Sequence, residues 1–243
     1  MVFERKISAG SFDLNKWLFG GYEKDIISVI YGDSGTGKTN FCLLAAVSQA
    51  KKGNKVIYID TEGGFSAERV KQIAPEDYEK VLENILILKP TNFDEQKEAF
   101  VELLKYLKDE ISLIVVDGMT ILYRLDFAVA REKDKDKDKD KGRDSNNGEI
   151  RKINSELVRQ MRTLAEIARK RNIPVIVTNQ VYRWEEEKKM VGGDILKYWG
   201  KCHIELANEK GRRFAYLRKH RSLPEKELEF KITQEGIAKR GWI

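Results

Sequence analysis

Cysteine and histidine are scarce in this chain of 243 residues, which holds two of each. Cys42 and Cys202 are too few for a disulfide framework and lack the close spacing of a zinc-binding motif. His203 and His220 have no partner cluster, so we expect no metal site built on histidine. This usage is typical of a protein with reduced thiols, and we expect a cytoplasmic location.

Long apolar runs are also absent. No stretch approaches the roughly 18 residues that a transmembrane helix needs. Residues 1–6 lack the apolar region of a secretory signal peptide. We therefore expect no membrane association. Hydrophobic residues still make up 41% of the chain, which suffices for one domain with a single core over residues 1–243.

Positive charge is concentrated near the C-terminus. The whole chain has a net charge of +6, and residues 200–243 hold 11 Lys or Arg against 6 Asp or Glu. Such a region could bind a polyanion such as DNA, or it could be the solvated surface of a lysine-rich protein. Charge alone leaves both interpretations open.

Short apolar runs alternate with segments of helical periodicity. Strands are predicted at 26–31, 56–60, 85–88, 113–117 and 174–179, and helices at 38–51, 94–109 and 150–171. Continuously apolar strands are typical of a parallel sheet buried on both faces. Short strands at 203–207, 214–219 and 227–232 follow without long helices between them. The prediction is an α/β fold with a mainly parallel central sheet flanked by helices and C-terminal antiparallel strands.

One segment has low complexity. Lysine and aspartate alternate over residues 133–141, and polar residues and glycine follow. The segment offers no apolar side chain to a core. We predict a mobile, exposed, charged loop over residues 132–148.

The strongest motif matches G-x-x-x-x-G-K-[ST], between a predicted strand and a predicted helix. In such a P-loop, glycines let backbone amides wrap a phosphate, and the helix N-terminus attracts the same anion. Lys38 should reach the β- and γ-phosphates of ATP, and Thr39 should ligate Mg²⁺. The predicted cofactor-binding residues are Gly32, Asp33, Ser34, Gly35, Thr36, Gly37, Lys38 and Thr39.

Polar side chains follow three of the predicted strands. Asp117 ends one of them, where a carboxylate can hold the water shell of Mg²⁺. Glu62 lies two residues past another, where it could activate a water molecule or simply occupy a surface turn. Asn179 and Gln180 end a third, where they could sense a γ-phosphate or cap a turn.

A basic and aromatic cluster follows Gln180. Arg183, Trp184, Lys188 and Lys189 could bind single-stranded DNA, because aromatic rings stack on bases and cations contact phosphates. Three consecutive glutamates, residues 185–187, interrupt the cluster and would repel phosphates. We expect this cluster to lie in a loop.

These residues together resemble the core of RecA-family recombinases, and more closely the archaeal RadA/RadB group. The similarity runs almost end to end. The P-loop alone is shared by many protein families, whereas D-T-E-G, T-N-Q-V and L-P-E in this order are specific. The matching segments are residues 7–14, 20–21, 31–49, 59–65, 67–69, 113–117, 178–181, 192–193, 223–225 and 230–237.

The resemblance implies a role for several residues. Glu62 would activate the attacking water, and Gln180 would couple the γ-phosphate to the DNA-binding loop that follows it. Arg69 would lie over adenine. Lys219 and Arg221 would reach the nucleotide of a neighbouring subunit in a homo-oligomer.

Departures from the family pattern favour its short RadB branch. The match begins at residue 7, whereas RadA-type recombinases carry a helical DNA-binding domain and an oligomerisation linker before the core. The Lys-Asp repeat and the three glutamates occupy the two regions where the family has its DNA loops. RadB-like proteins are regarded as accessory factors in homologous recombination, with feeble ATP hydrolysis and association with DNA, RadA recombinase and a Holliday-junction resolvase.

Three functional hypotheses follow. The first is an ATP-binding, DNA-binding regulator of DNA repair and recombination with weak ATPase activity. The second is a DNA-dependent ATPase that carries out strand exchange, since Glu62, Lys38 and Asp117 are all present. The third is a P-loop signalling ATPase that does not act on DNA.

Overall fold

The computed structural model describes residues 5–137, 147–184 and 187–241. Within these ranges, the side chains of residues 134–137, 147, 183–184 and 187–189 are not described. Its larger sheet follows the order β12-β11-β10-β9-β3-β7-β6-β4-β5, with β8 paired to β7. A short β1–β2 pair lies apart. The strands are β1 (Lys6–Ile7), β2 (Tyr22–Glu23), β3 (Ile27–Gly32), β4 (Lys55–Asp60), β5 (Ile85–Leu88), β6 (Ile111–Asp117), β7 (Val175–Trp184), β8 (Glu187–Met190), β9 (Gly200–Glu209), β10 (Arg212–His220), β11 (Lys226–Thr233) and β12 (Gly236–Lys239).

The sheet has a parallel part and an antiparallel part. Strands β5, β4, β6, β7, β3 and β9 run parallel to their neighbours, and β10, β11 and β12 continue from β9 as antiparallel strands. The predicted fold class is therefore confirmed. Because the carboxyl ends of parallel strands share one edge, the segments after β3, β4, β6 and β7 meet there.

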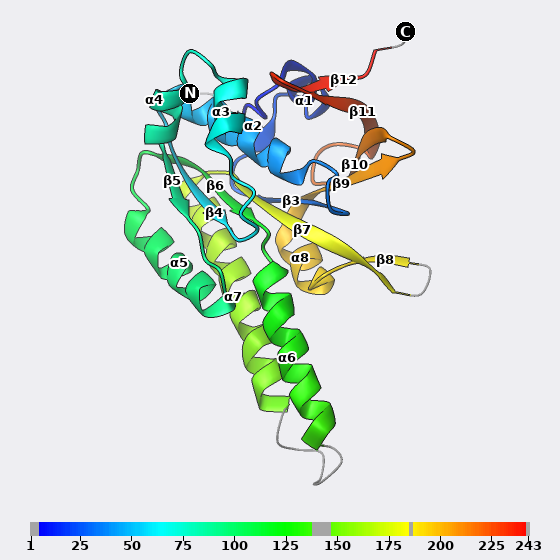
Figure 1. Cartoon of the computed structure of the whole chain (residues 1–243). Helices are drawn as coiled ribbons and strands as arrows, with labels where there is room; N and C mark the ends of the chain where they lie inside the picture. Colours follow the sequence, from blue (N-terminus) through cyan, green and yellow to red (C-terminus); the bar gives the residue numbers. More distant parts are fainter. Residues whose placement is uncertain (1–4, 138–146, 185–186, 242–243) are drawn as a thin grey trace.

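Helices cover both faces of the parallel part (Figure 1). One core contains the buried face of α2, and the other contains the buried face of α7. Continuous burial in β4 and β6 explains why these strands read as unbroken apolar runs. The helices are α1 (Phe12–Trp17), α2 (Lys38–Ala50), α3 (Ala67–Ile73), α4 (Tyr78–Glu83), α5 (Phe93–Tyr106), α6 (Ile121–Lys137), α7 (Asn147–Arg171) and α8 (Gly193–Trp199).

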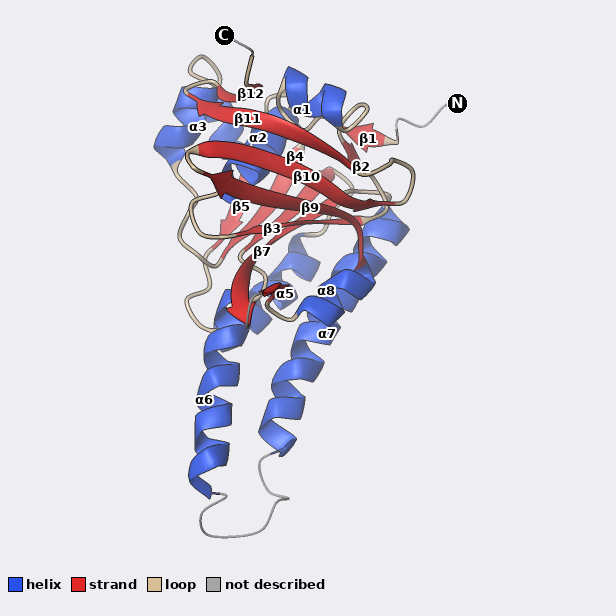
Figure 2. Ribbon diagram, turned by 90° about the vertical axis from the view of Figure 1, so that its right-hand side faces the viewer, coloured by secondary structure: helices blue, strands red, loops and turns tan. Residues whose placement is uncertain are grey.

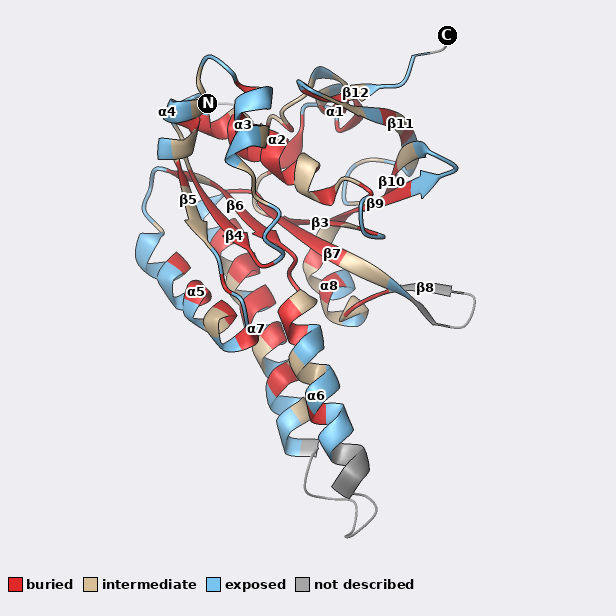
Figure 3. Cartoon of the chain, viewed as in Figure 1, coloured by how far each residue is buried: buried red, intermediate tan, exposed pale blue. Residues whose placement is uncertain are grey.

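Helices α6 and α7 extend side by side away from the sheet (Figure 2). Residues 132–137 belong to α6, so the prediction of a loop was wrong for this part. Residues 147–148 likewise lie in α7, and residues 138–146 are outside the described residues. Lysine and glutamate favour a helix here, and an exposed ion pair joins the two helices, since Lys133 Nζ lies 3.9 Å from Glu149 Oε1 on α7. Where α6 and α7 lie farthest from the sheet, their described residues are mostly exposed (Figure 3).

The region after Gln180 is also more regular than predicted. Strand β7 runs through Trp184, and β8 pairs with it in antiparallel register, with Arg183 opposite Lys188. The predicted loop at Trp184 is therefore part of a β-hairpin.

None of the described helices is long and apolar enough to span a bilayer.

Candidate functional site

The loop between β3 and α2 has the backbone of a phosphate cradle. Gly35 has φ 73° and Gly37 has φ 110°, values that favour glycine. Gly37 precedes α2, and no side chain caps that helix N-terminus within the described residues. The first amides of α2 therefore face the loop, where an anion can accept their hydrogen bonds.

Lys38 is buried against this loop. Its Nζ donates to the carbonyl oxygens of Gly32 at 3.1 Å and Asp33 at 2.9 Å. Burial lowers the pKa of Lys38, while the carboxylates of Glu62 and Asp117 oppose that shift. An ammonium group held among carbonyls and carboxylates at a P-loop can exchange those contacts for phosphate oxygens.

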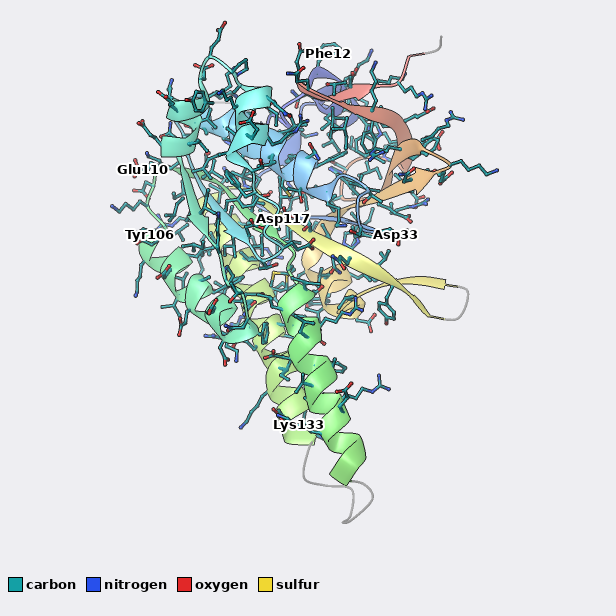
Figure 4. All side chains as sticks on the ribbon, viewed as in Figure 1. Phe12, Asp33, Tyr106, Glu110, Asp117 and Lys133 are labelled. Atoms are coloured by element: carbon teal, nitrogen blue, oxygen red, sulfur yellow. The ribbon has the colours of Figure 1, made fainter. Side chains whose placement is uncertain are left out.

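Asp117 lies at the end of β6, close to the first turn of α2. Its carboxylate accepts hydrogen bonds from the hydroxyls of Tyr58 at 2.9 Å and Thr178 at 2.7 Å, and another from Thr39. Burial raises the pKa of Asp117, and these three hydroxyl groups oppose the rise. Asp117 lies near the centre of the molecule, and Asp33 lies to its right in the view of Figure 4.

The oxygens of Thr39 and Asp117 fit an Mg²⁺ site. A Cβ at Gly64 would lie 3.2 Å from Thr39 Oγ1 and 3.8 Å from Asp117 Oδ2, so this glycine keeps the space beside both oxygens open. The described residues contain no group of three or more His, Cys, Asp or Glu that could hold a metal alone. Mg²⁺ suits such a site, because it usually binds one or two protein oxygens together with water and substrate phosphates.

Glu62 and Gln180 meet beside Lys38. Gln180 Nε2 lies 3.3 Å from Glu62 Oε1, which brings together two segments far apart in the chain. Partial burial raises the pKa of the Glu62 carboxyl, and the charge of Asp117 raises it further, whereas Lys38 lowers it. A raised pKa improves a carboxylate as a proton acceptor.

Asn179, in contrast to Gln180, is held inside the protein by hydrogen bonds. It is fully buried, its Nδ2 donates to Val191 O at 2.8 Å, and its Oδ1 accepts from Thr120 Oγ1. Successive residues of a strand point to opposite faces, so Asn179 and Gln180 cannot both face Glu62. Of these two neighbouring amides on β7, only Gln180 contacts Glu62 among the described residues.

Arg69 joins α3 to the turn between β11 and β12. Its guanidinium donates to the carbonyl oxygens of Thr233 at 2.8 Å and Gln234 at 3.0 Å, and its Nε donates to Asn40 Oδ1 at 3.0 Å. Asn40 belongs to the first turn of α2. Arg69 therefore connects the first turn of α2 with the β11–β12 turn.

Lys219 and Arg221 are engaged within the chain. Lys219 Nζ donates to the carbonyl oxygens of Lys197 at 3.0 Å and Gly200 at 3.1 Å. Arg221 pairs with Glu23 and, at 2.6 Å, with Asp25. To reach a neighbouring subunit, both side chains must first release these partners.

The predicted DNA residues Arg183, Trp184, Lys188 and Lys189 lie on the backbone of the β7–β8 hairpin. Their side chains are outside the described residues. The hairpin begins directly after Gln180 on the same continuous strand.

Several site residues were missed by sequence reasoning. Tyr58 and Thr178 orient Asp117 by their hydroxyl groups, and Asp60 accepts from the backbone amides of Gly64 at 3.1 Å and Phe65 at 2.9 Å. Asp60 thereby fixes the turn that carries Glu62. A polar residue near the end of an apolar strand was the only available signal, and it does not reveal the partner strand.

Comparisons with known proteins agree with this arrangement. The family model Rad51 matches residues 4–240. A protein described as DNA repair and recombination protein RadB from Methanocaldococcus jannaschii is 40% identical over 92% of this chain and 98% of the relative. A protein of the same description from Methanobrevibacter smithii is 39% identical over 92% of each chain.

A solved structure gives the same result. The crystal structure of the RadB recombinase superposes with a TM-score of 0.75 at 32% identity, covering 97% of this chain and 100% of that one. The chain therefore belongs to the Rad51 family, in its RadB branch.

Proposed function

We propose that this chain binds ATP with Mg²⁺, binds DNA, and acts as an accessory or regulatory protein of DNA repair and homologous recombination, with weak ATPase activity. The observation that carries the proposal is the convergence of Lys38, Thr39, Asp117 and Glu62 on one P-loop. The names of the RadB relatives supply the biological setting, because they are described as DNA repair and recombination proteins.

The positions of the side chains and the family resemblance support the proposed roles. The amides at the start of α2 and Lys38 bind the phosphates, while Thr39 and Asp117 hold Mg²⁺. When bound, Mg²⁺ neutralises phosphate charge. Glu62 accepts a proton from the attacking water, and Gln180 positions Glu62 and reports on the phosphates to the β7–β8 hairpin. Arg69 lies over the adenine base.

DNA and protein partners complete the proposal. Arg183, Trp184, Lys188 and Lys189 contact DNA through the β7–β8 hairpin. RadA recombinase and a Holliday-junction resolvase are the proposed protein partners. In a homo-oligomer, Lys219 and Arg221 would turn toward the neighbouring nucleotide after releasing their present contacts.

The alternative is a DNA-dependent ATPase that performs strand exchange. The Glu62–Gln180 contact favours it, because a base and its positioning amide are both in place. The three glutamates in the hairpin region favour the accessory role, because they repel DNA phosphates. Membership in the Rad51 family favours both over a signalling ATPase.

DNA binding is tested by fluorescence anisotropy with labelled single-stranded DNA over a range of salt concentrations. Contacts to phosphates release counterions, so affinity should fall steeply as salt rises. The double variant Lys188→Glu and Lys189→Glu should weaken binding and flatten the salt dependence. Binding that ignores both salt and these substitutions would contradict the proposed DNA surface.

A further inference from the structure

Arg213 is a cation beside the P-loop that neither the motifs nor the family resemblance singled out. It lies at the start of β10, opposite Asn208 of β9 and Phe230 of β11. Its Nη2 lies 3.4 Å from the carbonyl oxygen of Gly35, at the tip of the P-loop. Arg213 thus brings a positive charge from the C-terminal antiparallel strands to the phosphate cradle.

Arg213 differs from the other arginines of these strands in its partners. Arg212 pairs with Glu229 at 2.5 Å, and Arg218 pairs with Glu205 at 2.7 Å. Arg213 pairs with no carboxylate among the described residues, and its Nε is buried without a hydrogen-bond partner there. A partly buried guanidinium with an unsatisfied Nε and no carboxylate beside it is unfavourable, so a bound anion would stabilise this position.

The space next to Arg213 is open and positive. A cavity of about 450 Å³ is lined by Arg213, Phe230, Lys231, Ile232 and Arg240 together with two glycines, and it has no acidic residue in its lining. It borders the P-loop, because Ile232 Cδ1 lies 3.2 Å from the position that a Cβ would take at Gly37. The guanidinium therefore has room to leave the Gly35 carbonyl for a phosphate on the same loop.

We propose that Arg213 contacts the polyphosphate of the nucleotide bound in the P-loop, as a phosphate-binding arginine supplied by the same chain. The inference rests on the proposed function, since it requires a nucleotide at the P-loop. A guanidinium suits the task because its planar fork matches phosphate oxygens and keeps its charge at any physiological pH. The contact would tie β10, and with it β11 and β12, to the presence of nucleotide.

The test compares the affinity for Mg²⁺·ATP of wild type, Arg213→Gln, Arg213→Lys and Lys38→Ala by titration calorimetry. Arg212→Gln is the matched control, because Arg212 is the adjacent residue on β10 and is exposed and paired with Glu229. Arg213→Gln should bind ATP roughly ten- to a hundredfold more weakly, the loss expected for a charge-assisted hydrogen bond. Arg213→Lys should recover part of the loss, and Arg212→Gln should bind as wild type does.

A thermal melt without nucleotide separates phosphate binding from a structural clamp on the loop. Arg213→Gln should keep the wild-type Tm, because it removes an uncompensated charge, while its ATP-induced rise in Tm should shrink. Wild-type ATP affinity in Arg213→Gln, with binding lost in Lys38→Ala, would overturn the inference and retain the proposed function. A lowered Tm with unchanged ATP affinity would also overturn it, and no ATP binding in wild type would overturn both.

Discussion

Gly118 shows how a single residue fixes the position of the proposed base. It follows Asp117 with φ 95°, and a Cβ there would lie 2.3 Å from Thr61 Oγ1 and 2.7 Å from Glu62 Cγ. We predict that Gly118→Ala displaces Glu62, lowers ATP turnover more than ATP affinity, and destabilises the fold by about 1–3 kcal/mol. Steady-state kinetics with a chemical-denaturation curve measure both effects.

Gly63→Ala is the matched control, because Gly63 has φ 70° but no atom within 4 Å of its added Cβ. It carries the same kind of backbone strain without the collision. Equal loss of turnover in both variants would show that strain alone, and not displacement of Glu62, is responsible.

His203 makes the free energy of unfolding depend on pH. Burial, together with the charges of Lys219 and other lysines, lowers the pKa of His203 to about 4. The unfolded chain, with an ordinary histidine pKa near ~6.5, binds more protons than the folded chain between these values. The contribution of His203 to the free energy of unfolding is therefore fully present above pH ~6.5. It is lost as the pH falls toward 4, and the loss is about 3 kcal/mol at most.

Thermal melts from pH 7 to pH 4 measure this term in wild type and His203→Gln. The variant should show a shallower fall in Tm over the acid range. An identical slope in the two proteins would assign the acid sensitivity to other groups.

Arg69 connects three elements of the fold, namely α2, α3 and the β11–β12 turn. We predict that Arg69→Ala lowers the free energy of unfolding by about 1–2 kcal/mol, because the guanidinium is partly exposed and its hydrogen bonds are partly screened. Arg162→Ala is the control, because Arg162 forms only an exposed pair with Glu166 on α7. Equal denaturation midpoints for the two variants would contradict a linking role.

Element positions were predictable from sequence wherever burial was uniform. The strands ending at Asp60 and Asp117, and the helix after the P-loop, follow from apolar runs and one Gly-rich motif. Helix α6 was not predictable, because its apolar residues Leu122, Tyr123 and Ala130 gain a partner only when α7 packs against them. The contacts of Thr178 and Tyr58 with Asp117 likewise depend on strand order, which local pattern does not encode.

In the whole molecule, the candidate site lies between the parallel and the antiparallel parts of one sheet. Parallel strands bring Glu62, Asp117 and Gln180 to one edge, and the antiparallel strands β10–β12 approach the P-loop from the other side. Gln180 leads into the β7–β8 hairpin, while Arg213 leads into the C-terminal strands. A nucleotide between them would be contacted by both, which suits a ligand that controls conformation.

The most direct test of this account is the ATP hydrolysis rate with and without single-stranded DNA, with Glu62→Gln measured in parallel. We predict slow turnover in both conditions by a protein that still binds ATP, and a further fall to background in Glu62→Gln. Strong stimulation by DNA that disappears in Glu62→Gln would contradict the accessory role and identify a strand-exchange motor.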